Sequence, residues 1–167
     1  MNTQHFLEFS RPFIDAGKNV FETMVFTKLD PSKPEIKKDY KSRGDVSAVL
    51  GLTGTIKKDG KEKEYKAMLV LSWPYQTYFK VASAMLMENF TEYSNEIADV
   101  GAEIANMIMG NAKRELATMG YTTNMAIPSI IEGSGHTIKY PDSTTIVMIP
   151  VNSAHGPFYI EICYTED

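Results

Sequence analysis

The segment from position 91 to position 120 has the properties of one long helix. It contains no proline, it is rich in Ala, Glu, Met and Ile, and it ends at Gly120, a residue common just after a helix C-terminus. A helix is therefore predicted over 91–119. Such a helix needs a core to pack against, because an advance of about 100° per residue gathers its large apolar side chains on one side. These are Ile97, Val100, Ile104, Met107 and Ile108.

Two further segments have apolar residues at helical spacing. The first predicts an amphipathic helix over 11–26, with Ser10 as its N-cap and Pro12 in its first turn. The second predicts a shorter helix over 75–88, directly before the long one.

The remaining regular segments read as strands. The dipeptide Asp59-Gly60 lies between two long strand-like runs, 45–57 and 63–73, and this arrangement predicts a β-hairpin. A short strand is predicted within 34–40. Three more strand candidates follow the long helix, and the tetrapeptide "SAHG" predicts a hairpin between the last two. They cover 123–133, 144–152 and 157–165.

The order of elements repeats a unit of one helix followed by strands. Two similar octapeptides accompany the repeat: "DAGKNVFE" at 15–22 and "DVGAEIAN" at 99–106. We therefore predict an internal duplication within a single domain (1–167), with half-repeats at roughly 11–73 and 91–165. The expected fold class is a two-layer α/β (α+β) domain, in which two long helices pack on one face of an antiparallel sheet built from both halves.

Composition and charge exclude several classes of partner. The net charge of −4 and the sequence pI near 5.4 argue against binding to nucleic acid or to anionic membranes, since these partners require clustered Lys and Arg. The chain opens without the pattern of a secretion signal, and no window approaches the roughly 20 apolar residues of a membrane span. The single cysteine, Cys163, cannot form an internal disulfide. We expect a cytoplasmic protein.

One face of the long helix carries no large apolar side chain. A solvated face is the simplest interpretation of this pattern. However, Glu103 places a carboxylate three residues before the carboxamide of Asn106, and Gly110 follows one turn later. Glycine inside a helix costs roughly 1 kcal/mol relative to alanine, so it often marks a place of close packing. The full stripe is Glu92, Asn95, Asp99, Glu103, Asn106, Gly110 and Lys113.

Other candidate sites lack a necessary part. The histidines His5, His136 and His155 have no second histidine or cysteine three or four residues away, so no metal site is predicted. The serine of "GSGH" at 133–136 is near a histidine but lacks the strand-to-helix turn of a nucleophilic serine. Phosphate-loop spacing is also absent from "GTIKKDGKE".

The stripe resembles the signature of a known family. Asp99, Glu103 and Asn106 on a long helix match the pattern of the CheC and CheX phosphatases of bacterial chemotaxis: Asp or Ser, three residues, Glu, two residues, Asn. The resemblance extends to the order of elements and to the duplicated halves. CheC-type members carry the signature on both long helices and CheX-type members on one. In the first helix the positions of Glu and Asn are exchanged: Asp15 is followed by Asn19 and then Glu22. This chain therefore resembles the CheX type.

The resemblance implies an activity and a partner. The substrate would be the aspartyl phosphate of a CheY-like response regulator, which supplies Mg²⁺, so the chain needs no cofactor of its own. Asn106 would orient the attacking water, Glu103 would pair with a lysine of the regulator, and Asp99 and Gly110 would contact the partner. CheX-like proteins pair through their sheets, so a homodimer is expected.

Two other functions are compatible with the same residues. The chain could be a non-catalytic module that binds a response regulator and is related to flagellar switch proteins. It could also be an unrelated α/β enzyme that uses Asp99 and Glu103 as a carboxylate pair. The sequence leaves open which regulator is the substrate, whether the output is chemotaxis, what Asp99 does, and whether Asp15, Asn19 and Glu22 retain a function.

Overall fold

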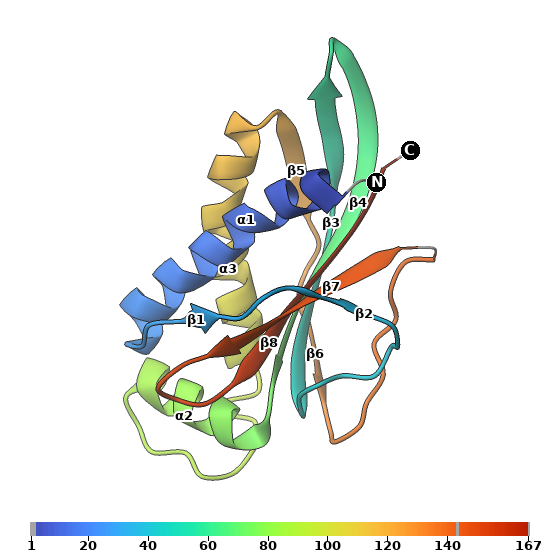
Figure 1. Cartoon of the computed structure of the whole chain (residues 1–167). Helices are drawn as coiled ribbons and strands as arrows, with labels where there is room; N and C mark the ends of the chain where they lie inside the picture. The colour runs from blue at the N-terminus through green and yellow to red at the C-terminus, as the bar shows by residue number, and fades with distance from the viewer. Residues whose placement is uncertain (1–2, 143, 167) are drawn as a thin grey trace.

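Two long helices lie on one face of an antiparallel sheet, and a shorter helix lies at one end of it (Figure 1). The structure is a computed structural model that describes residues 3–142 and 144–166. The predicted two-layer α/β architecture is confirmed. Its helical elements are α1 (Thr3–Val20), a π-helical turn η1 (Phe21–Val25) that continues α1, α2 (Tyr75–Leu86) and α3 (Val100–Thr118).

The sheet contains eight strands in the order β1-β7-β8-β4-β3-β5, with β2 also paired to β7 and β6 also paired to β3. Every pairing between these strands is antiparallel. The strands are β1 (Asp30–Pro31), β2 (Glu35–Lys37), β3 (Val46–Lys58), β4 (Lys61–Trp73), β5 (Tyr121–Met125), β6 (Ser129–Glu132), β7 (Thr145–Asn152) and β8 (Phe158–Glu166).

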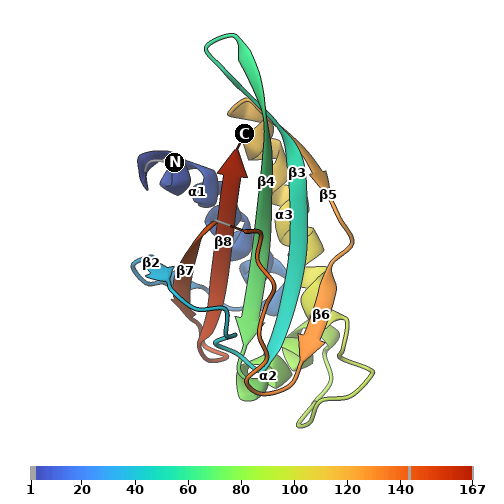
Figure 2. The same ribbon diagram turned by 90° about the vertical axis from the view of Figure 1, so that its right-hand side faces the viewer.

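The strand pairing has pseudo-twofold symmetry. Each half of the chain supplies a long helix, a strand broken in two, and then two long strands. The broken strand of each half pairs with the other half: β1 and β2 with β7, and β5 and β6 with β3. The last strands of the two halves, β4 and β8, pair at the centre of the sheet (Figure 2). The half-repeat boundaries at 11–73 and 91–165 stay a prediction.

The hairpin predicted around Asp59-Gly60 is confirmed. Strands β3 and β4 pair without interruption from Val46↔Trp73 to Lys58↔Lys61. Asp59 and Gly60 both have positive φ, at 51° and 75°. A two-residue turn of this kind matches the twist of the strands that it joins. The predicted strands at 34–40, 144–152 and 157–165 also form, as does the hairpin between β7 and β8.

The first helix begins earlier than predicted. It starts at Thr3, so Pro12 lies inside α1, and the Ser10 hydroxyl donates to the Leu7 carbonyl at 3.0 Å instead of capping the helix. The apolar stripe continues toward the N-terminus through Phe6 and Phe9, which are 4% and 0% exposed. Burial of these aromatic side chains outweighs the proline, which in a helix interior costs about 3 kcal/mol.

The long helix begins later than predicted. Residues 91–99 form bends and turns, and α3 starts at Val100. Glu92 and Asn95 therefore lie outside the helix and do not extend its stripe. Composition alone suggested a helix here, but tertiary contacts at the start of α3 override helix propensity. The contact responsible comes from α2, where the Tyr78 hydroxyl accepts the Gly101 amide N–H at 3.0 Å.

The two faces of the sheet are covered differently. The main core lies between the sheet and the helices, whereas a second, smaller cluster lies on the opposite face. The connection after β6 crosses that opposite face (Figure 2). The strand predicted over 123–133 is divided into β5 and β6 by residues 126–128, which include Pro128. The smaller cluster consists of Met68, Val70, Ile138, Tyr140, Ile146 and Cys163.

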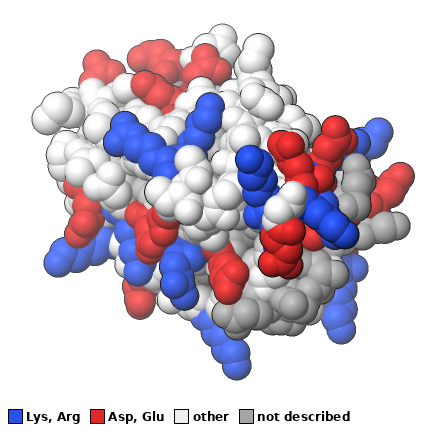
Figure 3. All heavy atoms as spheres, turned by 90° about the horizontal axis from the view of Figure 1, so that it is seen from above, with Lys and Arg blue, Asp and Glu red and all other residues white. Residues whose placement is uncertain are grey.

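Charged side chains of both signs are intermixed on the end of the molecule seen from above (Figure 3). That surface lacks the continuous basic patch with which proteins bind phosphate backbones. Among the helices of the described residues, none has both the length and the apolar character needed to cross a membrane.

Candidate functional site

Glu103 and Asn106 lie in the first two turns of α3, with both side chains exposed to solvent. Ile104 and Ile108 are buried on the opposite side of the helix, at 0% and 1% exposure. Residues three apart on a helix have Cβ atoms roughly 5–6 Å apart, so a carboxylate and a carboxamide stand side by side. Within residues 3–142 and 144–166, neither side chain has a hydrogen-bond or ion-pair partner. Both polar groups can therefore meet a ligand or another protein.

Asp99 is the N-cap residue of α3, but its side chain does not cap the helix. The carboxylate is exposed, and its charge contributes to the raised pKa of Tyr93. Burial is the first cause of that raised pKa, followed by the charges of Glu132 and Asp99. Asp99 and Glu132 therefore lie near Tyr93 and place two negative charges beside the start of α3.

The two glycines of α3 have opposite surroundings. A Cβ atom on Gly101 would lie 2.9 Å from Cζ3 of Trp73 and 3.2 Å from Cδ1 of Ile130, so Gly101 permits the helix to approach the sheet closely. No heavy atom lies within 4 Å of the corresponding position on Gly110, which is exposed. Close packing was the reason to expect a special role for Gly110. Within this chain, the glycine that packs closely is Gly101. Gly110 leaves a flat place on the helix surface one turn beyond Asn106.

The octapeptide of the first helix lies in a different environment. Asp15 and Asn19 belong to the last turns of α1, and Glu22 belongs to η1. The Asn19 carbonyl accepts a hydrogen bond from the Thr23 hydroxyl at 2.8 Å. Glu103 stands in the first turn of its helix, where the helix dipole favours an anion, whereas Glu22 stands near the unfavourable end. The octapeptides are therefore not at equivalent places along their helices, contrary to the expected register.

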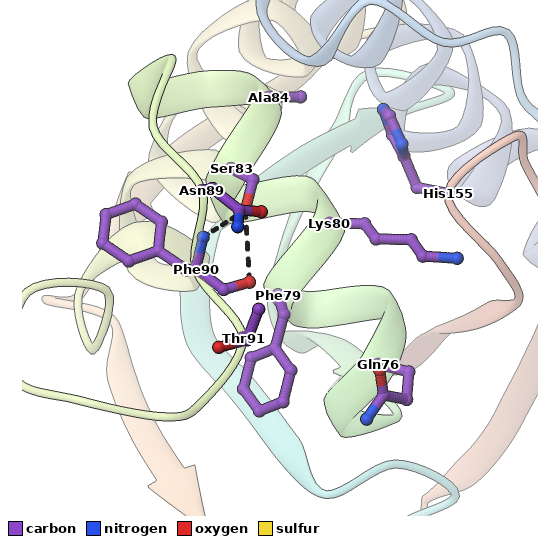
Figure 4. Close-up of a pocket in the computed structure, with 9 residues that line it drawn as sticks. All are labelled: Gln76, Phe79, Lys80, Ser83, Ala84, Asn89, Phe90, Thr91 and His155. Carbon is purple, nitrogen blue, oxygen red and sulfur yellow. Dashed lines mark hydrogen bonds between the residues drawn. The ribbon is translucent and has the colours of Figure 1, made fainter.

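Glu103 and Asn106 are exposed and lie outside three hollows of the surface that the structure describes. A hollow of about 450 Å³ lies beside α2, lined by residues of α2, the following loop and His155 (Figure 4). Two further hollows, of about 380 Å³ and 480 Å³, lie over the second face of the sheet and beside the N-terminal part of α1. None of these three includes Glu103 or Asn106. A small-molecule enzyme usually encloses its substrate, so an open site favours a macromolecular partner.

The histidines make structural contacts far apart in the sequence. His136 places Nε2 2.8 Å from Oγ of the buried Ser47 and Nδ1 2.7 Å from the Gly133 carbonyl. His155 Nε2 lies 2.9 Å from the Val25 carbonyl. In the sequence His136 lies two residues from Ser134, and no local signal points to Ser47. Among the described residues, no three His, Cys, Asp or Glu side chains are grouped as metal ligands would be.

The protein shares its fold with known chemotaxis proteins. The structure resembles that of a CheC-like superfamily protein from Shewanella sp. PV-4, with a TM-score of 0.82 and 32% identity over 99% of each chain. It also resembles the chemotaxis protein CheX from Desulfovibrio desulfuricans, with a TM-score of 0.82 and 34% identity over 95% of this chain and 99% of the other. The chain therefore has the CheC-like fold.

A family model described as chemotaxis phosphatase CheX matches residues 46–152. The protein belongs to this CheX family, as the signature and the order of elements predicted. A CheX–CheY–BeF3–Mg²⁺ complex from Borrelia burgdorferi contains a chain with the same fold, at a TM-score of 0.73 and 22% identity over 95% of this chain and 97% of that one. None of the curated proteins compared by sequence matches the chain.

Proposed function

We propose that this protein is an aspartyl-phosphate phosphatase that acts on a CheY-like receiver domain. The observation that carries the proposal is the exposed pair Glu103 and Asn106 on α3 in a member of the chemotaxis phosphatase CheX family. Neither side chain has a polar partner in the part of the chain that the structure describes. The Borrelia burgdorferi structure joins a CheX to a CheY. A receiver domain is also large enough to need the open surface on which the pair stands.

Asn106 is proposed to orient the water that attacks phosphorus. A carboxamide can accept from a water and donate to it, and so hold one lone pair in line with the bond that breaks. The water oxygen forms the new bond to phosphorus, the bond from phosphorus to the aspartate oxygen breaks, and inorganic phosphate and a free aspartate result. This reaction has a loose transition state, so positioning contributes more than a strong base.

Glu103 is proposed to pair with a lysine that lies beside the phosphoaspartate of the receiver. The carboxylate is one turn from Asn106, so an ion pair there would hold the carboxamide at a fixed distance from the phosphoryl group. Asp99 and Gly110 flank the pair and would contact the partner at the two ends of the interface. The Mg²⁺ that neutralises the phosphoryl oxygens would belong to the receiver, and this chain would bind no cofactor of its own.

Two wider expectations accompany the proposal. A homodimer remains a prediction, supported by the edge of the sheet at β5 and β6, where Met125 and Ile127 are 38% and 90% exposed. Exposed apolar side chains beside an open strand edge favour pairing with another chain. The cytoplasmic location also stays a prediction from the sequence.

The decisive experiment follows the decay of a phosphorylated CheY-like receiver domain in the presence of the protein. The phosphatase proposal expects phosphate release to accelerate, and to accelerate much less with Asn106→Ala. If the protein binds the phosphorylated receiver without changing its decay, the non-catalytic binding module is the correct function. Neither binding nor acceleration would favour the unrelated enzyme with Asp99 and Glu103 as its carboxylates.

A further inference from the structure

The start of α3 is capped by a residue from another helix. The Tyr78 hydroxyl, on α2, donates to the Ile97 carbonyl at 2.7 Å and accepts the Gly101 amide N–H at 3.0 Å. A free N–H in the first turn is usually satisfied by the N-cap side chain, but Asp99 makes no such bond. The tyrosine therefore performs the capping that the N-cap residue leaves undone.

Tyr78 is held rigidly in the core. Its side chain is 0% exposed, and its ring meets that of Trp73 edge-on at 5.4 Å between centroids. Burial raises the pKa of the Tyr78 hydroxyl above its usual value, so the group stays neutral and keeps both its donor and its acceptor function. The two hydrogen bonds thus come from a fixed point in the fold.

The contact between Gly101 and Trp73 limits how closely α3 approaches the sheet. Trp73 lies directly beneath Gly101, where even a methyl group would be too close. Tyr78 thus sets where the helical hydrogen bonding begins, and Trp73 sets how near the helix lies to the core. Since each residue advances a helix by about 100°, a change in the first turn alters the direction of the side chains that follow.

Glu103 and Asn106 follow Gly101 by only two and five residues. We propose that Tyr78 is a positioning residue: its hydroxyl fixes the first turn of α3 and thereby the direction in which Glu103 and Asn106 meet the receiver. The structural part of this inference stands on the contacts alone, and its effect on turnover rests on the proposed phosphatase function. Because Tyr78 is buried, it would act through α3 and not by contact with the receiver or the attacking water.

The first test measures the helix and needs no receiver. Tyr78→Phe keeps the buried ring and removes only the hydroxyl, so the Gly101 amide should exchange its hydrogen roughly fivefold or more faster, as expected when one hydrogen bond is lost. Tyr65→Phe is the matched control, because Tyr65 is 2% exposed and its hydroxyl shares a 2.8 Å hydrogen bond with Thr123 away from α3. Equal protection of Gly101 in wild type and Tyr78→Phe would overturn the inference.

The second test measures turnover. Tyr78→Phe should lower kcat for receiver dephosphorylation about tenfold or more, because small misplacements of reacting groups are costly, and it should also raise the Kd for the receiver, because the same turn directs Glu103. In an Asn106→Ala background the same substitution should lower kcat little further, since the carboxamide that it positions is absent. A merely destabilising change would lower both backgrounds equally, as Tyr65→Phe would if it had any effect.

The outcomes separate this inference from the proposed function. If the wild-type protein does not dephosphorylate the receiver, the phosphatase proposal fails, and hydrogen exchange at Gly101 still decides whether Tyr78 fixes the first turn. If the wild type is active and Tyr78→Phe is as active as Tyr65→Phe, the positioning role of Tyr78 is refuted and the phosphatase proposal stands.

Discussion

The Lys37 ammonium nitrogen lies 2.9 Å from Oε2 of Glu161, and both side chains are buried, at 0% and 1% exposure. The pair joins the short strand β2 to the central part of β8. Tyr140 completes the cluster, since its hydroxyl donates to Glu161 and accepts from Lys37 at 2.9 Å. Strand β2 is thus tied to this face of the sheet by a network whose polar groups satisfy one another.

Breaking this pair should destabilise the protein strongly. Lys37→Met removes the cation and leaves the Glu161 carboxylate buried without its counter-charge, which costs roughly 3–5 kcal/mol in the free energy of unfolding. Urea unfolding at neutral pH measures this loss. The double substitution Lys37→Met with Glu161→Leu should recover much of it, because an apolar pair leaves no unpaired charge. A single substitution that costs less than about 1 kcal/mol would contradict this view of the cluster.

The two glycines of α3 should respond to alanine with opposite signs. Gly110→Ala should stabilise the protein by about 1 kcal/mol, since the new methyl group meets nothing within 4 Å and alanine favours helix. Gly101→Ala should destabilise it by about 1–3 kcal/mol, because the methyl group would press on Trp73. Thermal unfolding of both variants tests the pair. Shifts of the melting temperature in the same direction would refute the prediction.

Acidification should weaken the fold partly through Glu166. Partial burial alone would raise its pKa, but the Tyr164 hydroxyl and the charges of Lys58 and His5 outweigh burial, so the pKa is lower than the usual value of 4.5. The folded state then binds this proton less readily than the unfolded state. The resulting stabilisation is complete above pH 4.5 and is lost as the pH falls through the folded pKa. Glu166→Gln should accordingly show a shallower loss of stability between about pH 5 and pH 3 than wild type in urea titrations. An unchanged slope would mean that Glu166 contributes nothing.

Local signals were sufficient for some elements and insufficient for others. Asp59 and Gly60 predicted their hairpin because a two-residue turn depends on the conformation of those residues alone. The start of α3 depends on Tyr78, which is more than twenty residues away from Gly101 and belongs to another helix. A helix boundary that is set by tertiary contacts cannot be predicted from a local sequence pattern.

The candidate site shows the same division. Glu103 and Asn106 could be identified because a helix places residues three apart on one face, and this spacing is visible in the sequence. The pairing of Ser47 with His136 joins residues far apart in the sequence, and the buried ion pair of Lys37 with Glu161 does the same. Such contacts require the strand register, which neither segment specifies by itself.

Glu103 should contribute chiefly to binding. If its carboxylate pairs with a receiver lysine at a shielded interface, Glu103→Ala leaves that lysine unpaired and weakens binding by roughly 2–5 kcal/mol. Titration with a receiver that carries a stable phosphate mimic measures the loss. Glu22→Ala is the matched control on the first helix and should leave binding unchanged. Binding that is as tight with Glu103→Ala as with wild type would refute the proposed ion pair.

Asn106 should contribute chiefly to turnover. A carboxamide that only orients water makes little contact energy with the receiver, so Asn106→Ala should leave its Kd largely unchanged. Phosphate loss should slow by on the order of 10² or more, the scale expected when a reacting water loses its orientation. Single-turnover decay of the phosphorylated receiver, followed alongside a binding titration, separates the two effects.

Asn19→Ala supplies the control for Asn106, because it removes the same carboxamide from an exposed position on α1. Turnover should stay near the wild-type rate in this variant, since Asn19 lies near the C-terminal end of its helix and the neighbouring Glu22 belongs to a π-helical turn. If Asn19→Ala slows phosphate loss as much as Asn106→Ala does, the reacting surface includes α1, and the assignment of the site to α3 alone is wrong. Full activity in Asn106→Ala would reject the water-orienting role itself, because no other carboxamide of α3 lies one turn from Glu103 on the same exposed face.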